Sequence, residues 1–149
     1  MLKTLPPFMS ADLLWVLAAM GHGDQLALVD RNYPAHTTAI GTRSGKLVQL
    51  QGTDVTTALR GIVQLLPLDS FIASPLAHMD PVDQPGVRLP VHREALAICE
   101  AAEGRQVGME VIGRLAFYAA ARDAFALVHT TEDRPYGCFL LTKGVVFAD

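Results

Sequence analysis

Two hydrophobic patterns alternate along this chain. In four segments apolar residues recur every three or four positions, which places them on one face of a helix. Ser10 precedes the first of these segments as a predicted N-cap, and either Thr53 or Asp54 precedes the second. Gly21 and Gly104 are expected to end the first and third helices, because glycine readily adopts the backbone of a helix C-terminus. The predicted helices are residues 11–20, 55–66, 91–104 and 114–124.

Between these helices lie short apolar runs that are typical of buried strands. They are residues 25–29, 43–50 with an initial turn, 70–79, 107–112, 125–130 and 138–147. Asp, Asn and Pro mark residues 30–36 and 80–86 as loops. Only the turn at residues 132–137 joins the last two strands, so these strands run in opposite directions. The pattern predicts one domain, residues 1–149, with an α/β fold: a three-layer α/β/α sandwich around a mixed, mostly parallel sheet.

The composition adds an expectation about assembly. Half of the residues are hydrophobic, and the mean hydropathy of +0.28 is high for a chain of 149 residues. A sheet that is apolar on both faces accounts for part of this excess, and an interface between copies accounts for more. We therefore expect a homo-oligomer.

Charge and cysteine usage narrow the class of protein. Twelve basic and 15 acidic residues give a net charge of −3. No basic block is present, which argues against nucleic acid as a partner. No apolar run is long enough to cross a bilayer, and the first residues lack the pattern of a signal peptide. Cys99 and Cys138 stand apart and are expected to be reduced thiols, so we expect a cytoplasmic protein with no membrane partner.

The stretch GHGD, residues 21–24, concentrates the candidate chemistry. His22 lies between two glycines, which allow backbone and substrate to approach closely. An imidazole with an ordinary pKa of about 6.5 can give or take a proton at neutral pH. Asp30 follows the apolar run 25–29, and ligands of open α/β sheets gather at strand ends. The alternative is that these residues only turn the chain.

A metal site and a phosphate site are weaker interpretations. A zinc site would use His22, Asp30 and His36, but no pair has the helical spacing of four and no cysteine cluster supports it. The glycines form neither a GxGxxG motif nor a P-loop. No metal or cofactor is expected. The remaining histidines are isolated and are interpreted as structural: His78, His92 and His129.

Three positions near the C-terminus are further candidates. Arg114 opens a predicted helix, where the helix dipole disfavours a cation, and this raises the case for a role against an anion or a hydroxyl-rich ligand. Tyr136 lies in a turn, and a tyrosine there can stack on a sugar or hydrogen-bond to it. Cys138 begins an apolar strand without an activating neighbour, so core packing is favoured over a nucleophilic role. Together with His22 and Asp30, the pattern indicates acid/base groups in loops around a small polar ligand.

At these same residues the chain resembles the fucose mutarotase and ribose pyranase family (RbsD/FucU). The resemblance runs over essentially the whole chain. It is carried by MLKTLPP, LLWVLAAMGHGDQLALVDRNYPAH, LLPLDSF, GRLAFYAAARDAFALVHTTEDRPYG and LLTKGVV. The fucose mutarotase branch is the more similar one, because it has an arginine at the position of Arg114 followed by AFY.

The resemblance implies an isomerase that interconverts the α and β anomers of a free monosaccharide, L-fucose in this branch, by opening and reclosing the sugar ring. Such a reaction requires neither metal nor nucleotide. The resemblance also implies a ring-shaped homo-oligomer, decamers included, with pockets near subunit contacts. The site residues that it implies are His22 as the catalytic acid and, for substrate binding, Asp30, Arg114, Tyr136, Gly137 and Cys138.

Two features leave alternatives open. The family turn usually has asparagine where Cys138 stands, and a thiol donates and accepts hydrogen bonds only weakly. A D-ribose pyranase and a sugar-binding module without catalysis therefore remain alternatives. In a straight strand at about 3.3 Å per residue, His22 and Asp30 lie too far apart to touch one sugar ring. Either the flanks of the strand curl back or two subunits form the pocket together.

Overall fold

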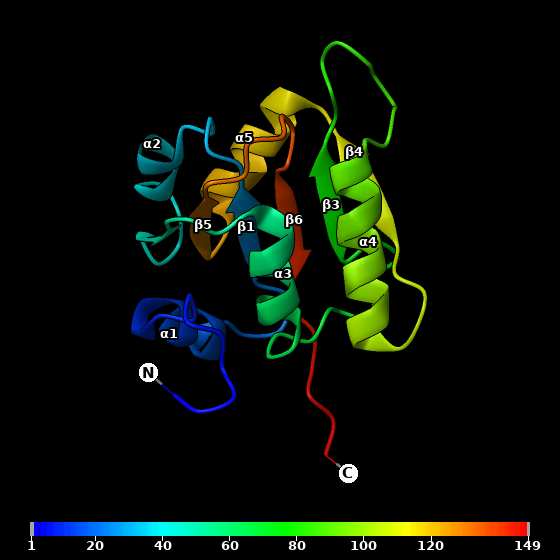
Figure 1. The fold of residues 1–149 in the computed structure, drawn as a ribbon. Helices are drawn as coiled ribbons and strands as arrows, with labels where there is room; N and C mark the ends of the chain where they lie inside the picture. Colours follow the sequence, from blue (N-terminus) through cyan, green and yellow to red (C-terminus); the bar gives the residue numbers. More distant parts are fainter. Residues whose placement is uncertain (1, 149) are drawn as a thin grey trace.

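Figure 1 shows the fold of the protein in a computed structural model that describes residues 2–148. A six-stranded sheet in this part of the chain has helices on both faces, so the predicted three-layer α/β/α sandwich is confirmed. The strand order is β2-β5-β1-β6-β3-β4. The strands are β1 (Gln25–Val29), β2 (Lys46–Leu50), β3 (Leu76–Met79), β4 (Met109–Ile112), β5 (Ala126–Thr130) and β6 (Phe139–Thr142).

The sheet is mixed because β6 alone opposes its neighbours. Strand β6 lies between β1 and β3 and pairs antiparallel with both, while the other neighbouring strands pair in parallel. The predicted opposite directions of β5 and β6 are confirmed. The two strands do not pair with each other, however, because β1 lies between them. This reversal brings the start of β6 to the same edge of the sheet as the carboxyl ends of β1 and β3.

The helices divide into two layers. One face of the sheet packs against α1 (Ala11–Ala19), α3 (Val55–Val63) and α4 (Pro90–Glu103), and the other packs against α2 (Ala35–Ala39) and α5 (Arg114–Asp123). Strand β1 shows how one sequence serves both layers. Leu26 and Leu28 enter the first core and Ala27 and Val29 the second, because side chains alternate along a strand. None of the helices within residues 2–148 is both long and apolar enough to cross a membrane.

The residues predicted to cap or end the helices do so in the structure, with one exception. The Ser10 hydroxyl accepts the N–H of the residue three positions on, and the Asp54 carboxylate, rather than Thr53, caps α3. Gly104 ends α4 in the left-handed conformation with φ of 65°. Gly21 does not end α1, because the helix stops at Ala19 and the next residue is already extended.

Three segments differ from their predicted structure. The last strand, β6, ends at Thr142 and Lys143 adds only a single bridge to Leu68, although the predicted strand runs to residue 147. Residues 35–39 form the short helix α2, although residues 30–36 were expected to be a loop. A helix of five residues is too short to show a hydrophobic period, so the sequence carries no signal for it. Strand β3 starts only at Leu76, because Pro75 and the bends before it interrupt the apolar run that begins at residue 70.

Candidate active site

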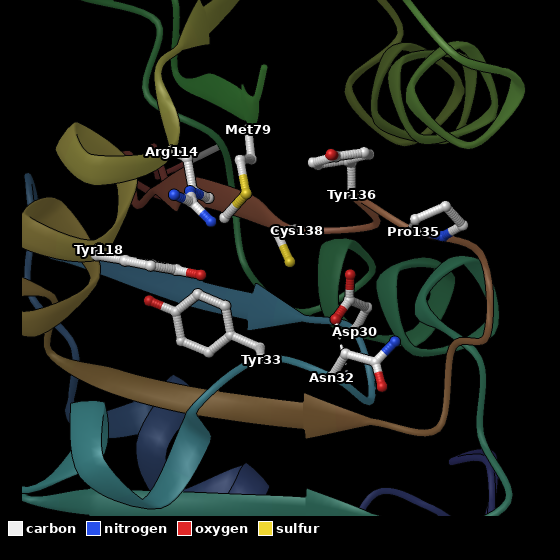
Figure 2. A pocket seen from close by; sticks show the side chains of 9 residues that line it. All are labelled: Asp30, Asn32, Tyr33, Met79, Arg114, Tyr118, Pro135, Tyr136 and Cys138. Atoms are coloured by element: carbon white, nitrogen blue, oxygen red, sulfur yellow. Dashed lines mark hydrogen bonds between the residues drawn. The ribbon is translucent and has the colours of Figure 1, made fainter. Parts of the chain in front are cut away.

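A cavity of about 200 Å³ lies at the edge of the sheet where the carboxyl ends of β1 and β3 meet the start of β6. Ligand sites of α/β sheets gather at such an edge. Figure 2 shows its lining side chains, with those of α5 on one side and those of the turn before β6 on the other. The lining residues are Asp30, Asn32, Tyr33, Met79, Arg114, Tyr118, Pro135, Tyr136 and Cys138.

Asp30 is the carboxyl group of this cavity. It directly follows β1 and is 7% exposed, and its Oδ1 accepts the backbone N–H of Asn32 at 3.0 Å. Burial raises the pKa of Asp30 above its ordinary value, although the N–H of Asn32 and the thiol of Cys138 act in the opposite direction. A carboxyl group with a raised pKa is suited to exchange a proton with a bound hydroxyl group.

Cys138 lies beside Asp30 at the base of the cavity. The side chain is buried, and burial, with the nearby Asp30 carboxylate, raises the pKa of its thiol well above the usual value. The group is therefore a protonated thiol at neutral pH, and only the thiolate is a strong nucleophile. Cys138 contributes a weak hydrogen-bond donor and an apolar sulfur surface to the cavity.

Tyr136 projects from the turn between β5 and β6. Its φ is +63°, in the left-handed region that non-glycine residues adopt at a cost. Gly137 follows it without lining the cavity. A Cβ at Gly137 would lie 2.9 Å from Cγ of Glu132, so the close approach of the turn to Glu132 requires glycine.

Glu132 anchors the same turn. Its carboxylate is buried and accepts hydrogen bonds from Nε of Arg134 at 2.8 Å and from the backbone N–H of Val55 at 3.3 Å. Burial opposes ionisation of this carboxyl, but the hydrogen bonds from Arg134 outweigh burial and lower its pKa. The turn is thereby tied to the N-terminus of α3 as a charged, fully paired unit.

Helix α5 supplies the cation of the cavity. Arg114 and Tyr118 are four residues apart, so both face the cavity from one side of the helix. Tyr33 packs edge-on against Tyr118 with ring centroids 5.3 Å apart. The cavity thus combines a guanidinium and a carboxyl group with aromatic rings and sulfur atoms. Such a lining fits a small ligand that has several hydroxyl groups and one apolar face.

His22 is not part of this cavity in the single chain. His22 precedes β1, whereas Asp30 follows β1. The five residues of β1 span about 16 Å. Nε2 of His22 lies 3.3 Å from Oδ2 of the buried Asp69. Asp69 also accepts the N–H of Phe71, and this bond, together with His22, lowers the pKa of Asp69. The histidine is half exposed and oriented by a carboxylate, which is an arrangement suited to proton transfer.

The three residues that a zinc site would use do not lie together in the structure. His22 and Asp30 lie at opposite ends of β1, and His36 lies on α2 with Nε2 at 3.2 Å from Nε2 of Gln49. Across residues 2–148, no three His, Cys, Asp or Glu side chains are close enough to share a metal ion.

The structure brings together four of the six residues that the sequence singled out. Asp30, Arg114, Tyr136 and Cys138 line one cavity, Gly137 shapes its turn, and His22 lies elsewhere. The lining residues that sequence reasoning missed are Asn32, Tyr33, Met79, Tyr118 and Pro135. Part of the signal was present, because Tyr118 stands one helical turn after Arg114 and Met79 ends a buried strand.

Comparison with known proteins extends these observations. The sequence pattern of the RbsD / FucU transport protein family matches residues 3–146. The chain is also 38% identical over 145 residues to the L-fucose mutarotase of Actinobacillus pleuropneumoniae serotype 5b, which covers 97% of each chain.

Solved structures share the fold. A protein with a proposed sugar-binding role superposes with a TM-score of 0.92 at 39% identity, over 99% of this chain and 97% of its own. The fucose mutarotase of Streptococcus pneumoniae in complex with L-fucose superposes with a TM-score of 0.84 at 33% identity, over 98% and 100%. RbsD of Bacillus subtilis, complexed with D-ribose, matches at 0.69 and 18% identity, over 99% and 100%, which shows a common fold.

Proposed function

Because this chain belongs to the RbsD/FucU family, we propose that it is an isomerase that interconverts the α and β anomers of a free monosaccharide, with L-fucose as the substrate. The observation that carries the proposal is the cavity in which Asp30, Arg114, Tyr136 and Cys138 meet. These are the positions that the family resemblance implies for sugar binding, and three separate segments of the chain supply them.

The lining of the cavity supports a deoxy sugar. Arg114 and Asp30 can hydrogen-bond to hydroxyl groups, which they do best away from bulk water. Met79, Cys138 and the ring of Tyr33 form an apolar part of the lining. L-Fucose carries a methyl group where an ordinary hexose carries a hydroxymethyl group, so it presents both kinds of surface.

The proposed reaction needs two proton transfers. One proton reaches the ring oxygen while another leaves the anomeric hydroxyl, the ring opens to the aldehyde, and it closes again on either face. In our proposal His22 supplies the first proton and Asp30 takes the second, since the raised pKa of Asp30 makes its carboxylate a stronger base than an ordinary one. General acid–base catalysis of this kind accelerates a reaction by roughly 10²–10⁴-fold.

A second copy of the chain completes this site in our proposal. His22 does not reach the cavity of its own chain, so a neighbouring copy contributes the pair of His22 and Asp69. The exposed ring of Phe71 lies 5.5 Å from the ring of His22, and the exposed ring of Phe147 packs against Phe71 at 6.3 Å between ring centroids. An apolar patch around a half-exposed histidine is the surface expected to meet another subunit. A ring-shaped homo-oligomer, a decamer as in the resemblance, is part of the proposal.

A cytoplasmic location is also part of the proposal. Cys99 and Cys138 are both buried free thiols, a state that is usual in a reducing compartment.

NMR saturation transfer between the two anomers of L-fucose tests the function. The wild-type protein is expected to accelerate exchange above the spontaneous rate. His22→Ala is expected to lower this acceleration by about 10²-fold or more, because the general acid is lost. His36→Ala is the matched control, since His36 is an exposed histidine outside the cavity, and it should exchange the anomers as fast as wild type.

The same experiment separates the alternatives. Acceleration of pyranose–furanose exchange of D-ribose, without an effect on L-fucose, would identify a D-ribose pyranase. Saturable binding of L-fucose at the uncatalysed exchange rate would identify a sugar-binding module, which the presence of Cys138 in place of an amide favours. An unchanged rate in His22→Ala would refute the catalytic role of that residue.

A further inference from the structure

Two buried histidines stack directly behind the turn that carries Tyr136. His78 lies on β3 and His92 in the first turn of α4, with exposed fractions of 1% and 0%. Their ring centroids are 3.8 Å apart and their planes differ by 24°. The sequence predicts only structural roles for them, but each ring hydrogen-bonds to the backbone of a residue that lines the cavity.

The hydrogen bonds of His92 define its tautomer. Nδ1 accepts the backbone N–H of Leu89 at 3.1 Å, so Nε2 carries the proton and donates it to the carbonyl oxygen of Tyr136 at 2.9 Å. Burial lowers the pKa of His92 to about 4, so the ring is neutral at physiological pH and keeps this tautomer. The imidazole therefore bridges the start of α4 and the cavity turn through two directional bonds.

The bond to Tyr136 falls on the one residue of the turn with strained backbone. Tyr136 has φ of +63°, and its conformation persists only where the surroundings enforce it. Glu132 holds the turn at Arg134, before the strained residue, and His92 holds it at Tyr136 itself. His78 adds a second contact, because its Nδ1 lies 3.0 Å from the carbonyl oxygen of Met79, which also lines the cavity. The stacked pair thus contacts the backbone of two lining residues.

We infer that His92 is a positioning residue of the sugar site: its Nε2–H holds the carbonyl of Tyr136 and thereby keeps the Tyr136 side chain over the cavity. The inference rests on the proposed function, since Tyr136 is taken there as a sugar ligand. His92 does not line the cavity and acts on the sugar only through the turn. Its loss weakens binding of the sugar more than it slows the proton transfers.

Two amide substitutions separate the two bonds of His92. The amide of His92→Asn can reach the position of Nδ1 and cap α4 but cannot reach Tyr136, whereas the amide nitrogen of His92→Gln can reach the position of Nε2. By saturation transfer on L-fucose, we expect KM to rise about tenfold in His92→Asn with little change in kcat. In His92→Gln, KM should return to within about threefold of wild type.

A matched control removes packing from the same helix without touching the cavity. Cys99 lies seven residues after His92 on α4 and is also 0% exposed. Cys99→Ala should lower the melting temperature and leave KM unchanged. A wild-type KM in His92→Asn would overturn the inference, and so would an equal rise of KM in His92→Asn, His92→Gln and Cys99→Ala.

The dissociation constant of L-fucose, measured by calorimetry, distinguishes this inference from the proposed function. A wild-type protein that binds L-fucose without accelerating exchange refutes the mutarotase proposal, and the role of His92 is then decided by the same variants on affinity. A wild-type protein that neither binds nor exchanges the sugar overturns both.

Discussion

At the scale of single residues, burial decides the protonation of the groups in the cavity. Asp30 and Cys138 are both buried and lie side by side, and burial raises the pKa of both. Their proximity raises the pKa of Cys138 further, because the Asp30 carboxylate disfavours a thiolate, whereas the hydrogen bond from the thiol lowers the pKa of Asp30. Cys138 is consequently a weak neutral donor at a position where an amide would both donate and accept. This difference bears on affinity rather than on the proton transfers that we propose for His22 and Asp30.

Replacing Cys138 by the amide of the related turns is expected to tighten sugar binding. Cys138→Asn adds a full donor and acceptor beside Asp30, and one net hydrogen bond corresponds to about a fivefold lower KM for L-fucose. Saturation transfer at several sugar concentrations measures this change. Cys99→Ser provides the comparison, since it alters a buried thiol remote from the cavity. An unchanged or higher KM in Cys138→Asn would show that the thiol does not limit binding.

At the scale of elements, the site depends on how helices and turns are tied together behind it. The turn at residues 132–137 is fixed to α3 through Glu132 and to α4 through His92. Arg114 and Tyr118 are placed by the single turn of α5 that separates them. Each tie uses a buried group in one protonation state, so pH acts on the frame of the site as well as on its chemistry.

The buried His92 makes stability depend on pH in a defined direction. Its pKa is about 4 in the folded chain and about 6.5 when unfolded, so folding favours the neutral ring. This contribution is complete above pH 6.5 and is lost as pH falls from about 6.5 toward 4, at roughly 1.4 kcal/mol per pH unit.

Urea unfolding over this pH range, in wild type and in His92→Gln, measures the contribution. His78, whose pKa burial also lowers, is present in both proteins, so the difference between the two reports the loss of the His92 ring together with its stacking on His78. Equal pH slopes in the two proteins would contradict the burial argument.

At the scale of the whole molecule, the proposed groups for proton transfer lie at opposite ends of one strand. Asp30 follows β1 at one end, and His22, paired with Asp69, precedes β1 at the other. The separation, about 16 Å along β1, is larger than a monosaccharide. In the proposed assembly, a head-to-tail arrangement brings the Asp30 end of β1 in one copy against the His22 end of β1 in the next, and such an arrangement can close into a ring.

Mixing two inactive variants tests this arrangement. His22→Ala and Asp30→Ala each lack one group, yet unfolding and refolding them together at equal amounts creates contacts with an intact His22 facing an intact Asp30. A random head-to-tail ring is expected to recover about a quarter of the wild-type exchange rate. The control is His22→Ala refolded with a variant that carries both His22→Ala and Asp30→Ala. No intact site can form in this mixture, because neither protein has His22. No recovery in the first mixture would exclude a site built from two copies.

The spacing of apolar residues along the sequence predicted much of the fold. The segments 25–29, 91–104 and 114–124 became β1, α4 and α5 nearly as predicted, because burial on one or both faces of a regular element leaves a period in the sequence. Asp30, Arg114 and Tyr136 could be recognised as ligand candidates because they stand where strands, helices and turns end. The helix α2 could not be predicted, since five residues carry no period.

Only the tertiary structure decided which of these residues meet. The insertion of β6 between β1 and β3 brings Cys138 against Asp30, and 108 positions of sequence separate the two. The same topology places His22 beside Asp69, at the other end of β1 from the cavity, and places His92 against the carbonyl of Tyr136. No local sequence pattern encodes either contact. Local periodicity depends on neighbouring residues, whereas the order of strands depends on how all the apolar faces can be buried at once.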